Sequence, residues 1–224
     1  MEIISHRGNM SGASPSTENT PAVFLEATQA GFGVELDLRI RDSNWYLSHD
    51  PVASGAPSQW LDSSTTSLID SNPHLSWAIN IKELSPPGML AELAAHSWFH
   101  SNCFLFDFEL LENDKAGHYQ TILSTQFNFP TAQLAARLSD RNEPLKQCLQ
   151  IGAGIVWADE FDSPWITQDD ADAVHGANRK FFFVSPELHG ADQESRLKRW
   201  NEIKLWGIDG ICTDYPLEAK AFFK

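Results

Sequence analysis

Two acidic residues, Glu35 and Asp37, stand two positions apart in the apolar run GVELDLRI at residues 33–40. Side chains at positions i and i+2 of a β-strand point to the same side, and here valine and leucine fill the alternate positions. Two carboxylates held together repel each other unless a cation lies between them, and oxygen ligands on a rigid strand suit Mg²⁺ or Ca²⁺. The pair therefore predicts a divalent-cation site, although an isolated pair of this kind also fits a solvated strand face.

Two histidines end other strand-like runs, and a hairpin can bring one of them, His49, to this pair. His6 and Arg7 end the first apolar run in the tripeptide HRG, which taken alone also fits a strand that ends in a polar turn. His49 ends the run WYLSHD, and only the residues RDSN separate this run from the one that carries Asp37. Because RDSN is too short for a crossover helix, we expect an antiparallel hairpin that returns His49 opposite Leu38, beside Asp37.

Nine short runs of apolar or alternating residues are typical of β-strands. They lie at residues 2–8, 33–40, 45–50, 77–83, 103–108, 134–139, 153–161, 180–187 and 209–216. Segments with helical spacing lie between most of them, at residues 18–30, 86–99, 143–152, 167–178, 193–207 and 216–224. Strand followed by helix, repeated through 224 residues, predicts an α/β protein: a (β/α)8 TIM barrel, with the surplus run forming a β-hairpin extension after strand 2.

The helix signals differ in strength along the chain. The clearest predicted helix covers residues 18–30, with Thr17 as its N-cap. In the second predicted helix Pro87 fits the first turn, and the residues SSTTS at 63–67 fit a polar loop. No linker rich in proline or glycine interrupts the alternation, so we expect a single domain over residues 1–224.

The composition excludes several classes of partner. With 16 basic and 30 acidic residues the formal charge is −14, which disfavours nucleic acid and stable association with anionic membranes as partners.

The three cysteines form no CxxC pair and are expected to be reduced core residues. No apolar run approaches the ~18 residues that a membrane span needs. We therefore expect a cytoplasmic protein, or one exported by a route that the sequence does not reveal. The sequence does not indicate the oligomeric state.

The predicted strand ends carry more ionisable side chains than packing requires. In barrels of this type chemistry collects at the carboxyl ends of the strands. Besides the residues named above, these ends hold Asn80, Lys82, Asp107, Asp159, Glu187, His189 and Asp214.

The order of these residues resembles that of a known family. The motifs are H-R-G at 6–8, E-N-T at 18–20, E-x-D at 35–37, H-D at 49–50, x-x-K ending at 82 and G-I-D-G-I-x-T-D-Y-P at 207–216. They resemble the glycerophosphodiester phosphodiesterases and, more widely, the phosphatidylinositol-phospholipase-like phosphodiesterase superfamily. The resemblance implies a (β/α)8 barrel and metal-dependent hydrolysis of a glycerophosphodiester or a similar small polyol phosphodiester, with Mg²⁺ as the favoured divalent cation and Ca²⁺ as the alternative.

The resemblance also implies a role for each matched residue. His6 and His49 become the general acid and base, because one histidine can take a proton from the attacking hydroxyl or water while the other protonates the leaving alkoxide. The remaining matches are Glu35 and Asp37 as metal ligands, Arg7 and Lys82 as cations against the phosphate, and Glu18 as a residue that orients Arg7 or caps the following helix.

Two departures from the family pattern bear on the metal and the substrate. Asn80 stands where the family usually has a glutamate as third metal ligand, so either its amide oxygen ligates the cation or Asp107 supplies the third carboxylate. Glu83 points to the other side of the strand and cannot replace it. The second departure is VSPELHG in the seventh strand, where we expect Glu187 and His189 to contact substrate, with a helix cap or loop bond as the alternative.

Other roles stay open at this stage. Trp157 and Phe161 are candidates for an apolar wall against a polyol, and Asp214 is expected to be a structural residue at a strand end. A phospholipase-type cleavage through a cyclic phosphate would use the same residues. A non-catalytic phosphodiester-binding protein is the third alternative, and Asn80 is the residue that favours it.

Overall fold

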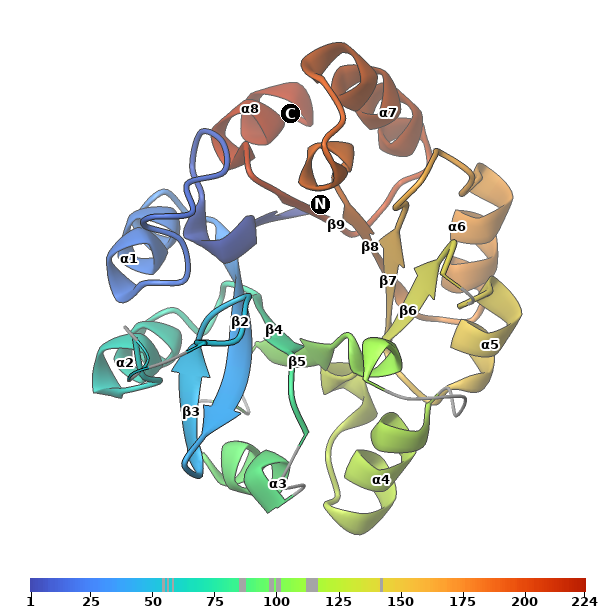
Figure 1. The fold of residues 1–224 in the computed structure, drawn as a ribbon. Helices are drawn as coiled ribbons and strands as arrows, with labels where there is room; N and C mark the ends of the chain where they lie inside the picture. Colours follow the sequence, from blue (N-terminus) through green and yellow to red (C-terminus); the bar gives the residue numbers. More distant parts are fainter. Residues whose placement is uncertain are drawn as a thin grey trace.

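The computed structural model of the chain describes residues 1–53, 55, 57, 59–84, 88–96, 99, 102–111, 117–141 and 143–224. Its strands are β1 (Glu2–Ser5), β2 (Gly33–Arg41), β3 (Asn44–Leu47), β4 (Trp77–Ile81), β5 (Cys103–Phe106), β6 (Ala135–Ser139), β7 (Ile155–Asp159), β8 (Lys180–Val184) and β9 (Gly210–Thr213). Apart from β3, they are parallel and follow the order β5-β4-β2-β1-β9-β8-β7-β6. A parallel bridge between Leu105 and Leu134 joins the two outer strands, so the barrel is nearly closed (Figure 1).

Helices surround this barrel on the outside (Figure 1). They are α1 (Pro21–Gln29), α2 (Ser63–Ser71), α3 (Gly88–Ala95), α4 (His118–Gln126), α5 (Leu145–Gln150), α6 (Gln168–Gly176), α7 (Gln193–Leu205) and α8 (Pro216–Phe222). The predicted (β/α)8 barrel is confirmed. Among the helices that the structure describes, none combines the length and the apolar composition of a membrane-spanning segment.

Two details of the predicted helices were wrong. The polar residues 63–67 begin helix α2, because the Asp62 carboxylate accepts the Ser64 N–H at 2.9 Å and Ile69 is fully buried. Helix α1 begins at Pro21 rather than at residue 18, so Thr17 is not its N-cap. Pro87 lies outside the described residues.

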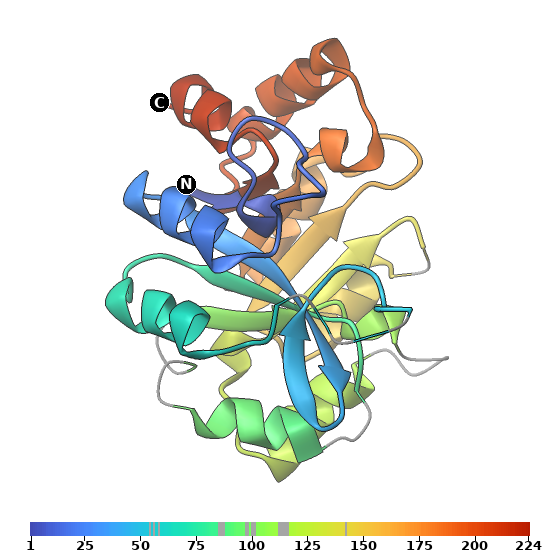
Figure 2. The ribbon, with the colours of Figure 1, turned by 60° about the vertical axis from the view of Figure 1, so that its left-hand side comes forward.

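The predicted hairpin is confirmed. Strand β3 pairs antiparallel with β2 through a two-residue turn in which Asp42 and Ser43 both have positive φ, 49° and 57° (Figure 2). These angles are typical of the tight hairpin turn that matches the twist of its strands. Leu38 pairs with Leu47 and not, as expected, with His49. His49 therefore lies two residues past the partner of Leu38, in the segment that follows the hairpin.

Aromatic side chains fill the interior of the barrel. Trp157 is 2% exposed, and its ring centroid lies 4.3 Å from that of Phe106 and 5.7 Å from that of Phe104. The three cysteines are buried thiols, as expected. The packed aromatic layer leaves the polar strand ends above it as the floor and walls of an open site.

Candidate functional site

A cavity of about 330 Å³ opens at the carboxyl ends of the barrel strands. Most predicted site residues line it: His6, Arg7, Glu35, His49, Asn80, Lys82 and His189. A cavity of about 410 Å³ lies beside α7; of its two lining cations, Lys198 and Arg199, the arginine is already paired with Glu160 at 2.7 Å. We place the candidate site in the smaller cavity because both predicted catalytic histidines converge there.

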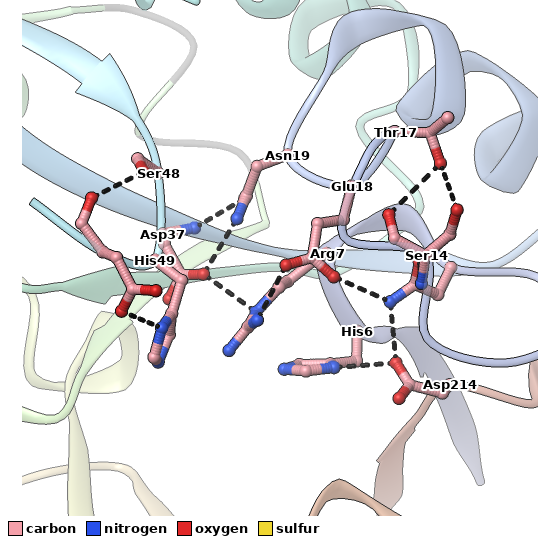
Figure 3. Close-up of polar contacts among 12 residues, drawn as sticks. His6, Arg7, Ser14, Thr17, Glu18, Asn19, Asp37, Ser48, His49 and Asp214 are labelled. Atoms are coloured by element: carbon pink, nitrogen blue, oxygen red, sulfur yellow. Dashed lines mark hydrogen bonds and ion pairs between the residues drawn. The ribbon is translucent and has the colours of Figure 1, made fainter. Parts of the chain in front are cut away.

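Asp37 lies beside this cavity, fully buried and surrounded by donors (Figure 3). Its Oδ2 is 3.0 Å from Arg7 Nε and accepts a hydrogen bond from Asn19 Nδ2 at 2.9 Å, and its Oδ1 is 3.2 Å from Lys82 Nζ. Burial alone would raise the pKa of Asp37, but the positive charges of Lys82 and Arg7 outweigh it and lower the pKa. Asp37 is therefore a carboxylate that anchors both cations.

Glu35 has the opposite electrostatic environment. It is 2% exposed, and burial together with the charge of Asp37 raises its pKa to about 7. Its Oε2 accepts the backbone N–H of Arg7 at 3.1 Å and lies 4.0 Å from His6 Nε2. The two acids of the E-x-D motif thus share one face, as predicted, and their pKa values are driven apart.

A strained loop presents Arg7 to Asp37. Arg7 and Asn19 adopt positive φ angles of 52° and 56°, which are uncommon for residues with a Cβ atom and concentrate at functional sites. Arg7 Nη1 donates to Glu18 Oε1 at 2.9 Å. Glu18 therefore orients Arg7, and because α1 begins only at Pro21, the alternative capping role has no support.

Asp214 joins the site although it was expected to be structural. Its Oδ1 lies 2.8 Å from His6 Nδ1 and also accepts a hydrogen bond from Asn9 Nδ2 at 2.8 Å (Figure 3). Strands β1 and β9 pair in parallel with Ser5 opposite Thr213. The residues that follow these two, His6 and Asp214, therefore lie side by side. The adjacency of the first and last strands in a closed barrel was the signal that could have predicted this contact.

The pKa values of His6 and His49 are shifted in opposite directions. Burial alone would lower the pKa of His6, but the hydrogen bond to Asp214 and the negative charge of Glu35 raise it overall. Burial and the positive charge of Arg7 lower the pKa of His49. The carboxyl group of Asp214 has a lowered pKa and only accepts, so His6 Nδ1 carries a proton and Nε2 is the atom on the side of Glu35.

Two hydrogen bonds from Arg39 hold the segment that carries His49. Arg39 donates to the His49 carbonyl oxygen through Nε at 2.9 Å and through Nη2 at 2.7 Å. The same guanidinium donates to Glu83 at 2.7 Å, so Glu83 faces away from the cavity, as predicted. The His49 side chain is 43% exposed and its Nδ1 lies 2.9 Å from Asp50 Oδ1.

Asn80 and Asp107 differ in their availability as metal ligands. Asn80 is 6% exposed, and its Oδ1 has no hydrogen-bond partner among the described residues. Asp107 forms an ion pair with the buried Arg137. No group of three His, Cys, Asp or Glu side chains in the described part of the chain is arranged to hold a metal. The predicted ligands Glu35 and Asp37 therefore lack a third such side chain, and the amide oxygen of Asn80 is the oxygen that could complete the set.

A second polar wall lines the same cavity, and its centre is Arg137, a residue that no sequence motif singled out. Arg137 is 2% exposed and pairs with Asp159 at 2.6 Å as well as with Asp107. Asp159 in turn bonds His189 Nε2, and the Phe161 ring lies 4.4 Å from the ring of His189. An arginine inside the apolar run LAARLS was the available signal, because a buried cation requires buried acidic partners.

Glu187 does not line the cavity. Its carboxylate accepts hydrogen bonds from the hydroxyls of Ser185 and Thr213 and from the backbone N–H of Asp214 at 3.1 Å. The structure therefore brings His189, but not Glu187, to the cavity wall.

Comparisons with known proteins give similarity at the level of structure. No protein-family model matches the chain, and no curated protein matches its sequence. A protein described as a glycerophosphodiester phosphodiesterase from Galdieria sulphuraria superposes with a TM-score of 0.68 at 16% identity, over 99% of this chain and 97% of that chain. A glycerophosphoryl diester phosphodiesterase from Parabacteroides distasonis gives the same TM-score and identity, over 99% of this chain and 85% of its own.

A Ca²⁺-dependent phosphatidylinositol-specific phospholipase C from Streptomyces antibioticus is also similar. Its TM-score is 0.61 at 11% identity, over 100% of this chain and 96% of that chain. These three names agree with the superfamily that the sequence motifs resemble. The chain therefore has the (β/α)8 barrel fold of these phosphodiesterase and phospholipase structures along nearly its whole length.

Proposed function

We propose that the chain is a metal-dependent phosphodiester hydrolase that acts on a glycerophosphodiester or a similar small polyol phosphodiester. The observation that carries the proposal is the meeting of His6 and His49, whose pKa values are shifted apart, with Glu35 and Lys82 in one cavity. The names of the three similar structures support the same reaction class.

The donor set suits a divalent cation. Glu35, Asp37 and the amide oxygen of Asn80 would hold it, and its charge would offset the burial and the repulsion from Asp37 that together raise the pKa of Glu35. Mg²⁺ is the favoured ion and Ca²⁺ the alternative. A bound divalent cation supplies Lewis-acid polarisation of a phosphoryl oxygen and stabilises its developing negative charge.

The opposite pKa shifts favour one assignment of acid and base. His49, with its lowered pKa, is neutral near pH 7 and can accept a proton from the attacking water. His6, with its raised pKa, can donate from Nε2 to the leaving alkoxide while Asp214 holds its Nδ1–H. Arg7 and Lys82 place positive charge where the phosphate would lie.

The second polar wall supports a hydroxyl-rich leaving group. Arg137, Asp159 and His189 place hydrogen-bonding groups at the cavity edge, which suits a polyol better than an acyl chain. The formal charge of −14 likewise favours a small soluble substrate over an anionic membrane surface.

The test is turnover of glycerophosphocholine, glycerophosphoinositol and bis(p-nitrophenyl) phosphate with Mg²⁺, Ca²⁺ or EDTA, followed by ³¹P NMR. We expect metal-dependent turnover that falls about 100-fold or more in His6→Ala and in His49→Ala. His74→Ala, which changes an exposed histidine remote from the cavity, serves as the matched control and keeps full activity. His189→Ala is expected to raise KM for the polyol substrates and to leave KM for bis(p-nitrophenyl) phosphate unchanged.

The products distinguish the alternatives. A linear glycerol phosphate supports hydrolysis, whereas a cyclic phosphate resonance would show the phospholipase-type cleavage. Binding of a phosphodiester without turnover in any metal would contradict the proposal and support a non-catalytic binding protein. Activity that survives His6→Ala would contradict the assigned mechanism.

A further inference from the structure

Glu187 bonds to the ends of two neighbouring barrel strands. Its carboxylate accepts hydrogen bonds from Ser185, which follows β8, and from Thr213, the last residue of β9. Both of these residues are fully buried. Because Glu187 does not line the cavity, its carboxylate is committed to the chain's own polar groups.

These contacts prolong the ladder between β8 and β9. The backbone bonds of that ladder end where the Ser185 N–H donates to the Cys212 carbonyl at 2.9 Å. Beyond this point the Asp214 N–H donates at 3.1 Å to the side chain of Glu187 instead of to backbone. Glu187 thus takes the place of a strand partner for the residue that holds His6.

The hydrogen bonds continue in both directions from Glu187. On one side Trp200 Nε1, on α7, donates to Ser185 Oγ at 2.8 Å. On the other side Asp214 Oδ1 lies 2.8 Å from His6 Nδ1. All the donors to Glu187 are neutral, and no ion pair of Glu187 occurs within the described ranges, so its role there is to accept hydrogen bonds in a fixed geometry.

We propose that Glu187 is a positioning residue: its carboxylate fixes the end of β9 so that Asp214 holds His6 in one orientation and one tautomer. The kinetic consequence of this inference rests on the proposed hydrolase function. The structural consequence, the tautomer of His6, does not.

The test compares Glu187→Ala with Glu187→Gln, and uses Glu194→Ala as a control at an exposed glutamate on α7. Glutamine keeps one oxygen for Thr213 and Asp214 and can donate to Ser185 Oγ, so its geometry is close to that of glutamate. We expect Glu187→Ala to lower kcat about 10- to 100-fold with KM within about twofold of wild type, as for other residues that orient catalytic groups. Glu187→Gln is expected to restore most of kcat, and the control to change neither constant.

A second readout is independent of activity. Long-range ¹H–¹⁵N spectra of the histidine side chains at one alkaline pH are expected to show His6 as the Nδ1–H tautomer in the wild type and in Glu187→Gln, and as a tautomer mixture in Glu187→Ala. If the wild type has no phosphodiesterase activity, the proposed function fails while this spectrum still tests the positioning role.

Three results would overturn the inference. A raised KM at unchanged kcat in Glu187→Ala would mean that Glu187 contacts substrate. Wild-type kcat in Glu187→Ala, or an unchanged His6 tautomer, would mean that Asp214 is held without it. If Glu187→Ala does not fold, Glu187→Asp retains the charge but withdraws the carboxylate by one methylene, and the same loss of kcat and of the single tautomer is expected.

Discussion

Asp37 and Asn80 are register partners on the neighbouring parallel strands β2 and β4, yet their oxygen atoms are in opposite situations. Asp37 lies beside two cations, Arg7 and Lys82, whereas Asn80 Oδ1 is buried with no hydrogen-bond partner among the described residues. A buried acceptor without a partner costs about 1–3 kcal/mol. A bound cation at this edge of the sheet would give the Asn80 oxygen the partner that it lacks among the described residues.

Asn80→Asp is expected to tighten divalent-cation binding about tenfold or more, because it adds a third carboxylate of the same shape to the donor set. Asn80→Leu, which keeps the volume but removes the oxygen, is expected to weaken binding. Isothermal titration calorimetry with Mg²⁺ and with Ca²⁺ measures both changes. Equal affinities in the wild type and both variants would exclude Asn80 as a ligand.

The affinity for the cation is expected to rise with pH up to about 7, because the proton on Glu35 must leave before this carboxylate can ligate. Glu35 has its pKa raised from 4.5 to about 7, so in EDTA its contribution to stability is fully present below pH 4.5 and is lost as pH rises to about 7. Melting curves from pH 4 to 8 with EDTA measure this loss. Glu35→Gln should abolish it, and an unchanged pH dependence in that variant would contradict the assignment.

The pH profile of kcat/KM is expected to be bell-shaped. His49 must be neutral to act as base, so activity falls as pH drops through its pKa, which lies below 6.5. His6 must be protonated to act as acid, so activity falls as pH rises through its pKa, which lies above 6.5. Residual activity should lose the acidic limb in His49→Ala and the basic limb in His6→Ala. The opposite pattern would reverse the two roles.

Arg137→Met is expected to destabilise the fold by about 3–5 kcal/mol, because Asp107 and Asp159 would remain buried without their shared cation. Urea denaturation measures the free energy of unfolding. Replacing both acids by asparagine in the same chain should recover much of the loss. If the single substitution were neutral, the carboxylates could not be held as the ion pairs that the structure shows.

The features that depend on local spacing could be predicted from the amino-acid sequence. The alternation of apolar runs with helical segments predicts the barrel, and the short RDSN connection predicts the hairpin. The two-residue period of a strand places Glu35 and Asp37 on one face without knowledge of any other element. Helix α2 was missed because its residues are polar, and burial of Ile69 against the rest of the fold stabilises it in spite of that composition.

The contacts among the candidate residues depend on how distant strands pair in the fold. His6 and Asp214 are 208 positions apart, and their contact exists because the first and last strands of the barrel pair in register. Glu187 was expected to contact substrate but bonds to the end of β9 for the same reason, because Thr213 and Asp214 come from a neighbouring strand. Periodicity specifies the face on which a side chain lies, whereas its hydrogen-bond partners follow from the pairing of distant strands, which no local pattern encodes.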